Sequence, residues 1–98
     1  MKAIRGATTV GADTPEEIRG VVSELLAEIK RCNKLDEDDI VCILFSNSAD
    51  IRSFYPAKAA REAGLSRAAL YSSLEPEIEG ALPLCIRVLL FAENCYSV

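Results

Sequence analysis

The clearest pattern of apolar and polar positions in the chain predicts a long amphipathic helix. Apolar side chains recur there at the three- and four-residue spacings of a single helical face. Thr14 precedes Pro15, and Glu17 follows Thr14 by three residues, which is the pattern of a capping box with proline at the first helical position. We therefore expect the helix to begin after Thr14 and to end near Asn33. The residues of its apolar face are Ile18, Val21, Val22, Leu25, Leu26 and Ile29.

Three further segments are predicted to be strands. Residues 2–10 carry β-branched side chains and end before Gly11, as expected of a strand that enters a turn. The segment 40–45 is continuously apolar, and 82–91 is apolar apart from one arginine and one proline. Apolar runs of this length between turn residues are typical of strands that are buried on both faces.

A short helix and another strand complete the expected order. The helix spans 56–63, with a proline at its start and Gly64 after its end. The strand spans 68–73, and a loop follows at 75–80. The order βαβαββ predicts an α/β fold with a mixed sheet and helices packed on it. A chain of 98 residues is too short to divide its core, so we expect a single domain over 1–98.

Composition and charge exclude several classes of protein. Fifteen acidic residues against eleven basic ones give a net charge of −4, which argues against a general nucleic-acid binder. No apolar run approaches the roughly 18 residues of a membrane span, and the first ten residues lack a signal-peptide core. We therefore expect a soluble, cytoplasmic protein that binds neither membrane nor nucleic acid. The chain has no histidine, which excludes histidine acid–base chemistry and histidine-ligated metals.

The candidate metal ligands are four cysteines and an acidic cluster. No two cysteines form a C-x-x-C pair, so a zinc site would require all four to converge from distant segments. Reduced thiols in a cytosolic protein are the favoured interpretation. The acidic cluster 36–39 is interpreted as a solvated turn, with a metal site as the alternative. The cysteines are Cys32, Cys42, Cys85 and Cys95.

Arg87 is unexpected within a run that is otherwise typical of a buried strand. Burial of an unpaired guanidinium costs several kcal/mol or more, so this side chain needs a partner. A structural salt bridge, or an edge position that lets the side chain reach water, is favoured by composition alone. The alternative is a ligand anion, and Arg5 in the first strand strengthens it, because two arginines could form a receptor for a carboxylate or phosphate. Glu75 could pair with either arginine or contact the ligand.

Three motifs together resemble a known family. They are IRGATTV at 4–10, FYPAKAAREAG at 54–64, and Glu75 followed by CIRV at 85–88. In this order and spacing they resemble the monofunctional chorismate mutase of the AroH class, the trimeric Bacillus type. The similarity runs from about Ile4 to Val88.

The resemblance implies a fold, an assembly and a reaction. Members of the family fold as βαβαββ and form a homotrimeric pseudo-barrel with active sites at the subunit interfaces. They catalyse the Claisen rearrangement of chorismate to prephenate in the biosynthesis of phenylalanine and tyrosine. The reaction uses no cofactor, metal or covalent intermediate.

Three residues match the catalytic positions of the family. Arg87 matches the arginine that contacts the breaking ether oxygen and a carboxylate of the substrate. Arg5 matches a second arginine that holds a carboxylate, and Glu75 matches the glutamate that accepts a hydrogen bond from the ring hydroxyl. Cys85, two residues before Arg87, is expected to be structural because the mechanism needs no nucleophile.

Five further residues match substrate-binding positions. Tyr55, Ala57 and Lys58 match the wall of the site that a neighbouring subunit donates, where the family commonly has phenylalanine at the first position. Arg61 matches an arginine near the mouth of the site. Ser72 falls where the Bacillus enzyme has a cysteine near the ring hydroxyl, across a one-residue gap.

The resemblance ends near Phe91, and the short C-terminus departs from the family. Family members continue through another strand, with a tyrosine that binds a substrate carboxylate, and through a mobile tail over the site. Tyr96 is too close to Arg87 to replace that tyrosine. We expect impaired activity, because one pre-organised donor contributes about a hundredfold in rate and a covering tail excludes water.

Two other functions stay open at this point. One is a non-catalytic trimeric protein of the same fold that binds small anions. The other, more distant, is that of the similarly folded trimeric enamine/imine deaminases, which the arginine pair and the YPAK segment do not favour.

Overall fold

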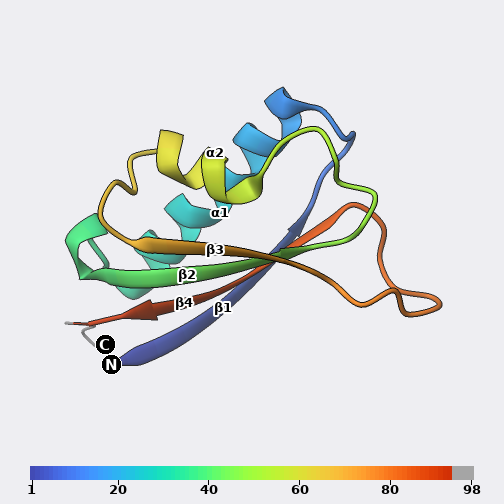
Figure 1. Cartoon of the computed structure of the whole chain (residues 1–98). Helices are drawn as coiled ribbons and strands as arrows, with labels where there is room; N and C mark the ends of the chain where they lie inside the picture. The colour runs from blue at the N-terminus through green and yellow to red at the C-terminus, as the bar shows by residue number, and fades with distance from the viewer. Residues whose placement is uncertain (94–98) are drawn as a thin grey trace.

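The computed structural model describes residues 1–93. Within this range the order of strands and α-helices is βαβαββ, as predicted, and the fold is α+β (Figure 1). The elements are β1 (Lys2–Thr9), α1 (Pro15–Asn33), a 3-10 turn (Glu37–Asp39), β2 (Ile40–Asn47), α2 (Pro56–Glu62), β3 (Ala69–Leu74) and β4 (Cys85–Ala92). Neither helix of the described range combines the length and apolarity that a bilayer span requires.

The four strands form one mixed sheet in the order β1-β4-β2-β3. β4 is antiparallel to both of its neighbours, whereas β2 and β3 are parallel. A parallel pair needs a crossover connection, and α2 supplies it. The β2–β4 ladder shifts by one residue between Ile40 and Cys42, so Val41 is an extra residue of a β-bulge and is 44% exposed.

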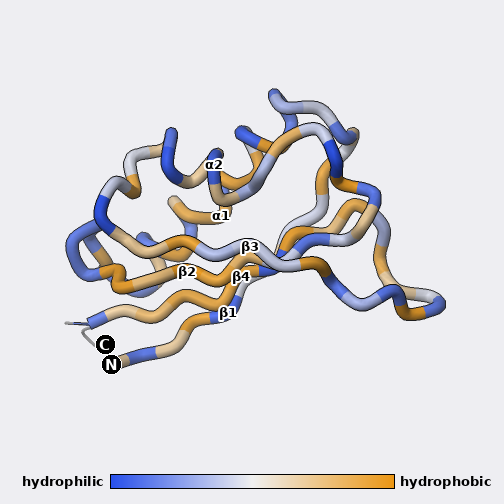
Figure 2. Tube along the Cα trace, viewed as in Figure 1, coloured by the Kyte–Doolittle hydropathy of each residue, from blue (hydrophilic) through white to orange (hydrophobic). Residues whose placement is uncertain are grey.

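Both helices lie over the same face of the sheet, and the hydrophobic core fills the space between them and the strands (Figure 1). Figure 2 shows the apolar residues concentrated along the strands, with hydrophilic residues at many of the loops and helix ends. The helix α1 contributes every fourth or third residue to the core, as its apolar pattern predicts. Its buried residues are Ile18, Val22, Leu26 and Ile29.

The sheet is covered on one face only, so the prediction of strands buried on both faces is wrong for the single chain. In β2, Ile43 and Phe45 are buried in the core, whereas Leu44 between them is exposed. In β4, Val88 is buried and Arg87 is exposed. Successive side chains of a strand point to opposite faces, and neither helix of residues 1–93 covers the second face. We call that second face the open face.

The strand β4 begins at Cys85, three residues later than predicted. Pro83 has no backbone N–H to donate to a ladder, and Leu84 has a left-handed φ of 49°. The backbone N–H of Leu84 donates to Asp50 and not to a neighbouring strand. Residues 82–84 therefore belong to the loop.

The predicted helix ends are confirmed. Thr14 Oγ1 accepts a hydrogen bond from the backbone N–H of Glu17 at 3.2 Å, and α1 ends at Asn33 with Lys34 in the left-handed conformation. Gly64 follows α2 with a φ of +114°, and a Cβ atom there would lie 2.7 Å from Glu37 Oε1. Glycine is the residue that this helix end requires.

Two glycine substitutions should have opposite effects on stability. Gly64→Ala should lower the free energy of unfolding by about 1–2 kcal/mol, because alanine is strained at this φ. Gly20→Ala, in the middle of α1 where a Cβ atom meets nothing within 4 Å, should raise it by about 0.5–1 kcal/mol. Urea unfolding of both variants measures the two changes. Equal stability of the two variants would contradict the assignment of Gly64 as the helix stop.

Candidate functional site

Arg5 and Arg87 lie on the open face of neighbouring strands. Arg5 on β1 pairs with Leu89 on β4, and Ala7 pairs with Arg87. Leu89 and Arg87 are two residues apart and therefore point to the same face. Both arginines line one hollow of about 220 Å³ on that face. The two guanidinium groups thus share a space that is open to a ligand.

Arg87 forms an ion pair with Glu75, but not in a closed core. The Nε atom of Arg87 lies 3.4 Å from Oε1 of Glu75, and the side chains are 52% and 26% exposed. Ion pairs with this exposure contribute about 0–1 kcal/mol. Within residues 1–93, neither Nη atom of Arg87 has a hydrogen-bond partner. The salt-bridge interpretation of Arg87 is therefore correct in part, and the guanidinium keeps donors for an anion.

Glu75 is held at the end of β3. Its backbone N–H donates to the carbonyl of Asn47 at 2.9 Å, which continues the pairing of β3 with β2. Its carboxylate accepts a hydrogen bond from the Ser46 hydroxyl on β2. Strand β2 thus fixes both the backbone and the side chain of Glu75.

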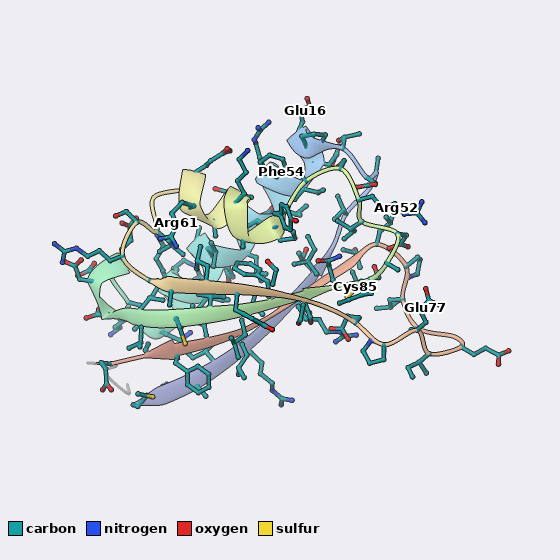
Figure 3. All side chains as sticks on the ribbon, viewed as in Figure 1. Glu16, Arg52, Phe54, Arg61, Glu77 and Cys85 are labelled. Atoms are coloured by element: carbon teal, nitrogen blue, oxygen red, sulfur yellow. The ribbon has the colours of Figure 1, made fainter. Side chains whose placement is uncertain are left out.

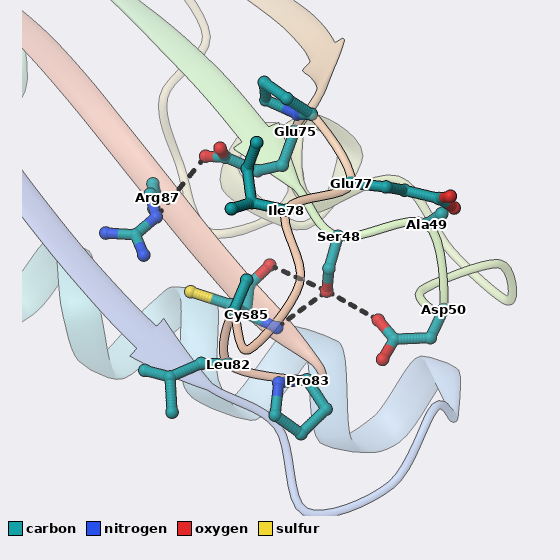
Figure 4. Close-up of a pocket in the computed structure, with 12 residues that line it drawn as sticks. Ser48, Ala49, Asp50, Glu75, Glu77, Ile78, Leu82, Pro83, Cys85 and Arg87 are labelled. Carbon is teal, nitrogen blue, oxygen red and sulfur yellow. Dashed lines mark hydrogen bonds and ion pairs between the residues drawn. The ribbon is translucent and has the colours of Figure 1, made fainter.

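A second and larger hollow, of about 470 Å³, lies beside the first (Figure 4). Glu75 and Arg87 form one side of it, Ser48 and Asp50 another, and the loop 76–83 a third. Figure 3 shows Glu77 on this loop, which extends beyond the end of the sheet. Arg87 lines both hollows.

The start of β4 is clamped by Ser48 and Asp50 (Figure 4). The Ser48 hydroxyl donates to Asp50 Oδ1 at 2.5 Å and accepts from the backbone N–H of Cys85 at 2.9 Å. Asp50 Oδ2 accepts from the backbone N–H of Leu84, also at 2.9 Å. The hydrogen bond from Ser48, followed by the one from Leu84, holds the pKa of the Asp50 carboxyl below its usual 3.8. This clamp sets the position of β4 two residues before Arg87.

The residues predicted on and beside α2 lie on the other side of the sheet. Tyr55 precedes α2 and is 70% exposed, while Ala57 packs against the core. Lys58 Nζ lies 5.2 Å from the centre of the Phe54 ring. Arg61 Nη1 donates to the carbonyl of Leu65 at 2.5 Å, and Figure 3 shows Phe54 and Arg61 on the helix side. Within one chain these residues do not meet Arg5, Glu75 and Arg87.

Ser72 and Ser73 lie on opposite faces of β3. Ser72 pairs with Phe45, whose side chain is in the core, so Ser72 faces the helices. Ser73 pairs with Ser46 and lines the hollow that Arg5 and Arg87 share. Of these two serines, the one that lines the hollow with Arg5 and Arg87 is therefore Ser73. The match of Ser72 to a position near the ring hydroxyl of the substrate stays a prediction.

The candidate metal ligands do not form a site within residues 1–93. No three Cys, Asp or Glu side chains of that range converge as metal ligands. Cys32, Cys42 and Cys85 are free thiols, and the acidic cluster 36–39 includes a 3-10 turn. Cys95 and Tyr96, named in the sequence predictions, lie outside the described residues.

Two groups around Glu75 and Arg87 are not among the predicted site residues, namely Ser46 and the pair Ser48 and Asp50. All three lie in the polar segment SNSAD, directly after the apolar run of β2. Polar side chains at the end of a buried strand in a mixed sheet often line a site. That placement was the signal available in the sequence.

The arrangement is that of a receptor for a small anion. Two arginines on one face supply planar donor groups, and a carboxylate beside them accepts hydrogen bonds. A family model described as Chorismate mutase type I matches residues 1–97, and the chain belongs to this family.

Named relatives and a solved structure agree with the family. The chain is 39% identical over 90 residues to chorismate mutase AroH of Thermus thermophilus, a match that covers 91% of this chain and 74% of the relative. It is 38% identical over 95 residues to chorismate mutase AroH of Bacillus subtilis (strain 168), covering 96% and 75%. A solved chorismate mutase from Clostridium thermocellum has a TM-score of 0.90 at 41% identity, covering 94% of this chain and 82% of that one.

The clamp on β4 should depend on pH. The folded-state pKa of Asp50 is lowered from 3.8, so its stabilising effect is complete above the unfolded pKa and is lost as the pH falls through the lowered folded value. Asp50→Asn should therefore be less stable than the parent at neutral pH, and the difference should shrink below about pH 4. Urea unfolding at several pH values measures this, with Glu24→Gln on the exposed side of α1 as control. A difference that does not change with pH would contradict the role of the ionised carboxylate.

Proposed function

We propose that this chain catalyses the rearrangement of chorismate to prephenate in aromatic amino acid biosynthesis. The observation that carries the proposal is the pair of arginines lining one hollow on the open face, with Glu75 beside Arg87. Membership of the chorismate mutase type I family supports it and does not favour the non-catalytic alternative. Chorismate carries two carboxylates, and the arginines match that charge.

The proposed mechanism is electrostatic. As the ether bond of chorismate lengthens, negative charge develops on its oxygen, and a fixed Arg87 guanidinium stabilises that charge more than it stabilises the ground state. Arg5 holds a carboxylate, and Glu75 accepts a hydrogen bond from the ring hydroxyl. Together they keep the enolpyruvyl arm folded over the ring, which supplies the proximity required by a unimolecular rearrangement. No proton transfer or covalent intermediate is required.

The proposed assembly is a homotrimer with each active site shared by two chains. Tyr55, Ala57 and Lys58 would complete the wall of a neighbouring chain's site, with Arg61 near its mouth. Their position on the helix side of the sheet, away from the open face, is consistent with this. The open face carries apolar side chains on all four strands, and an exposed apolar patch of this kind marks an interface. Its apolar residues, from the strand register, are Ala3, Ala7, Cys42, Leu44, Ala69, Tyr71, Leu89 and Phe91.

A cytoplasmic location and a single-domain organisation are part of the proposal. The free thiols of Cys32, Cys42 and Cys85 support a reducing compartment. The single core shared by both helices and all four strands supports one domain.

Replacement of Arg87 should abolish most of the activity. Arg87→Ala should lower kcat/KM for chorismate by about a hundredfold or more, because it removes a pre-organised charge from the transition state. Arg67→Ala, an exposed arginine paired with Asp38, is the matched control and should change kcat/KM by less than about twofold. The loss of chorismate absorbance measures the rate. A folded parent protein without turnover above the uncatalysed rate would contradict the proposed function, and prephenate binding by that protein would favour the anion-binding alternative.

Mixed assemblies should test the shared site. Inactive Arg87→Ala chains mixed with inactive Lys58→Ala chains should regain activity, because some interfaces then combine an intact arginine face with an intact Lys58. Arg87→Ala mixed with Arg5→Ala should regain none, since both arginines come from one chain. Light scattering should give a mass three times the 10.7 kDa of the chain. Recovery of activity in both mixtures, or in neither, would contradict active sites that combine residues of two chains.

A further inference from the structure

Ser46 lies on the open face near the end of β2, which runs between β4 with Arg87 and β3, the strand that leads to Glu75. On one side it pairs with Arg87 of β4, and on the other with Ser73 of β3. It is half-buried and lines the hollow shared by Arg5 and Arg87. Its position therefore connects the strand that holds the arginine with the strand that leads to Glu75.

The Ser46 hydroxyl and Arg87 contact the same carboxylate oxygen of Glu75. The hydroxyl donates a hydrogen bond to Oε1 of Glu75, and that oxygen also lies 3.4 Å from Nε of Arg87. Within the described residues, Oε2 of Glu75 accepts no hydrogen bond. Two donors thus converge on one oxygen, while the second oxygen and both Nη atoms of Arg87 keep their hydrogen-bonding capacity.

The hydroxyl is needed because the ion pair alone is a weak restraint. An exposed Glu–Arg pair contributes about 0–1 kcal/mol and must restrain two flexible side chains. A hydrogen bond from a hydroxyl to a carboxylate is stronger than one between neutral groups. Because Ser46 stands on a central strand of the sheet, its hydroxyl is a firmer anchor than the long arginine side chain.

We propose that Ser46 is a positioning residue for the rearrangement, and this inference rests on the proposed function. Its hydroxyl anchors Oε1 of Glu75 and thereby leaves Oε2 available to a hydroxyl of the substrate. The same arrangement directs Glu75 to Nε of Arg87, so that the two Nη atoms remain available to anionic oxygens. Ser46 itself makes no contact with the reacting atoms.

Three substitutions and one control test the proposal. Ser46→Ala should lower kcat/KM for chorismate by about tenfold or more, the effect of losing a hydrogen bond to a charged group. Ser46→Thr keeps the hydroxyl and suits a strand, so it should stay within about threefold of the parent. Ser46→Cys, a weak donor of similar shape, replaces the alanine variant if the latter does not fold. Ser23→Ala, on the exposed side of α1, should leave kcat/KM unchanged.

A double-mutant cycle separates positioning from a structural role. In a Glu75→Ala background, Ser46→Ala should change kcat/KM by less than about twofold, because the hydroxyl has lost its acceptor. The same cycle, measured as the Kd for prephenate by titration calorimetry, needs no turnover. Equal losses in both backgrounds, or a loss matched by a fall in the free energy of unfolding, would overturn the role of Ser46. A parent protein that binds prephenate without converting chorismate would instead overturn the proposed function, and the calorimetric cycle would still decide the positioning role.

Discussion

The organisation of this protein depends on the alternation of side chains along its strands, because the helices of residues 1–93 cover one face of the sheet and leave the other open. Each strand delivers one set of side chains to the core and the other to the open face. In β4 this places Val88 in the core and Arg87 outside it. The same alternation explains how a chain with half its residues apolar presents two arginines without burying either charge. The core and the candidate site are thus built by the same strands.

Polar residues at the ends of the strands complete the site. The segment that follows the apolar part of β2 supplies the hydroxyl that holds Glu75, and it also supplies the clamp on the start of β4. Both Glu75 and Arg87 are thereby held by β2 and by the residues directly after it, a segment that contains neither of them. The loop between β3 and β4 is long and exposed, but both of its ends are held by hydrogen bonds. At one end the backbone N–H of Glu75 donates to Asn47, and at the other the backbone N–H of Leu84 donates to Asp50.

Local patterns predicted the elements well, and the faces of the strands less well. The sequence of the long helix predicted its N-cap residue, the helical spacing of its apolar face and its last residue, and all three predictions are confirmed. The apolar runs of β2 and β4 carry no alternation of hydrophobic and polar residues that would reveal an uncovered face. Ser72 was predicted by an alignment with a one-residue gap, and one residue exchanges the faces of a strand. Ser46 could not be predicted as a site residue, because its contacts are with β3 and β4 and with Glu75, which are distant in the sequence.

The bulge in β2 has a consequence for changes in chain length. Val41 is the unpaired residue of the β2–β4 ladder, and the pairing continues from Cys42 onward. Removal of one residue at this point would restore a regular ladder and leave the partners of Ile43 and Ser46 unchanged. A deletion farther along the strand would instead turn Ser46 toward the helices. The beginning of β2 is therefore where the deletion of one residue is compatible with an intact site.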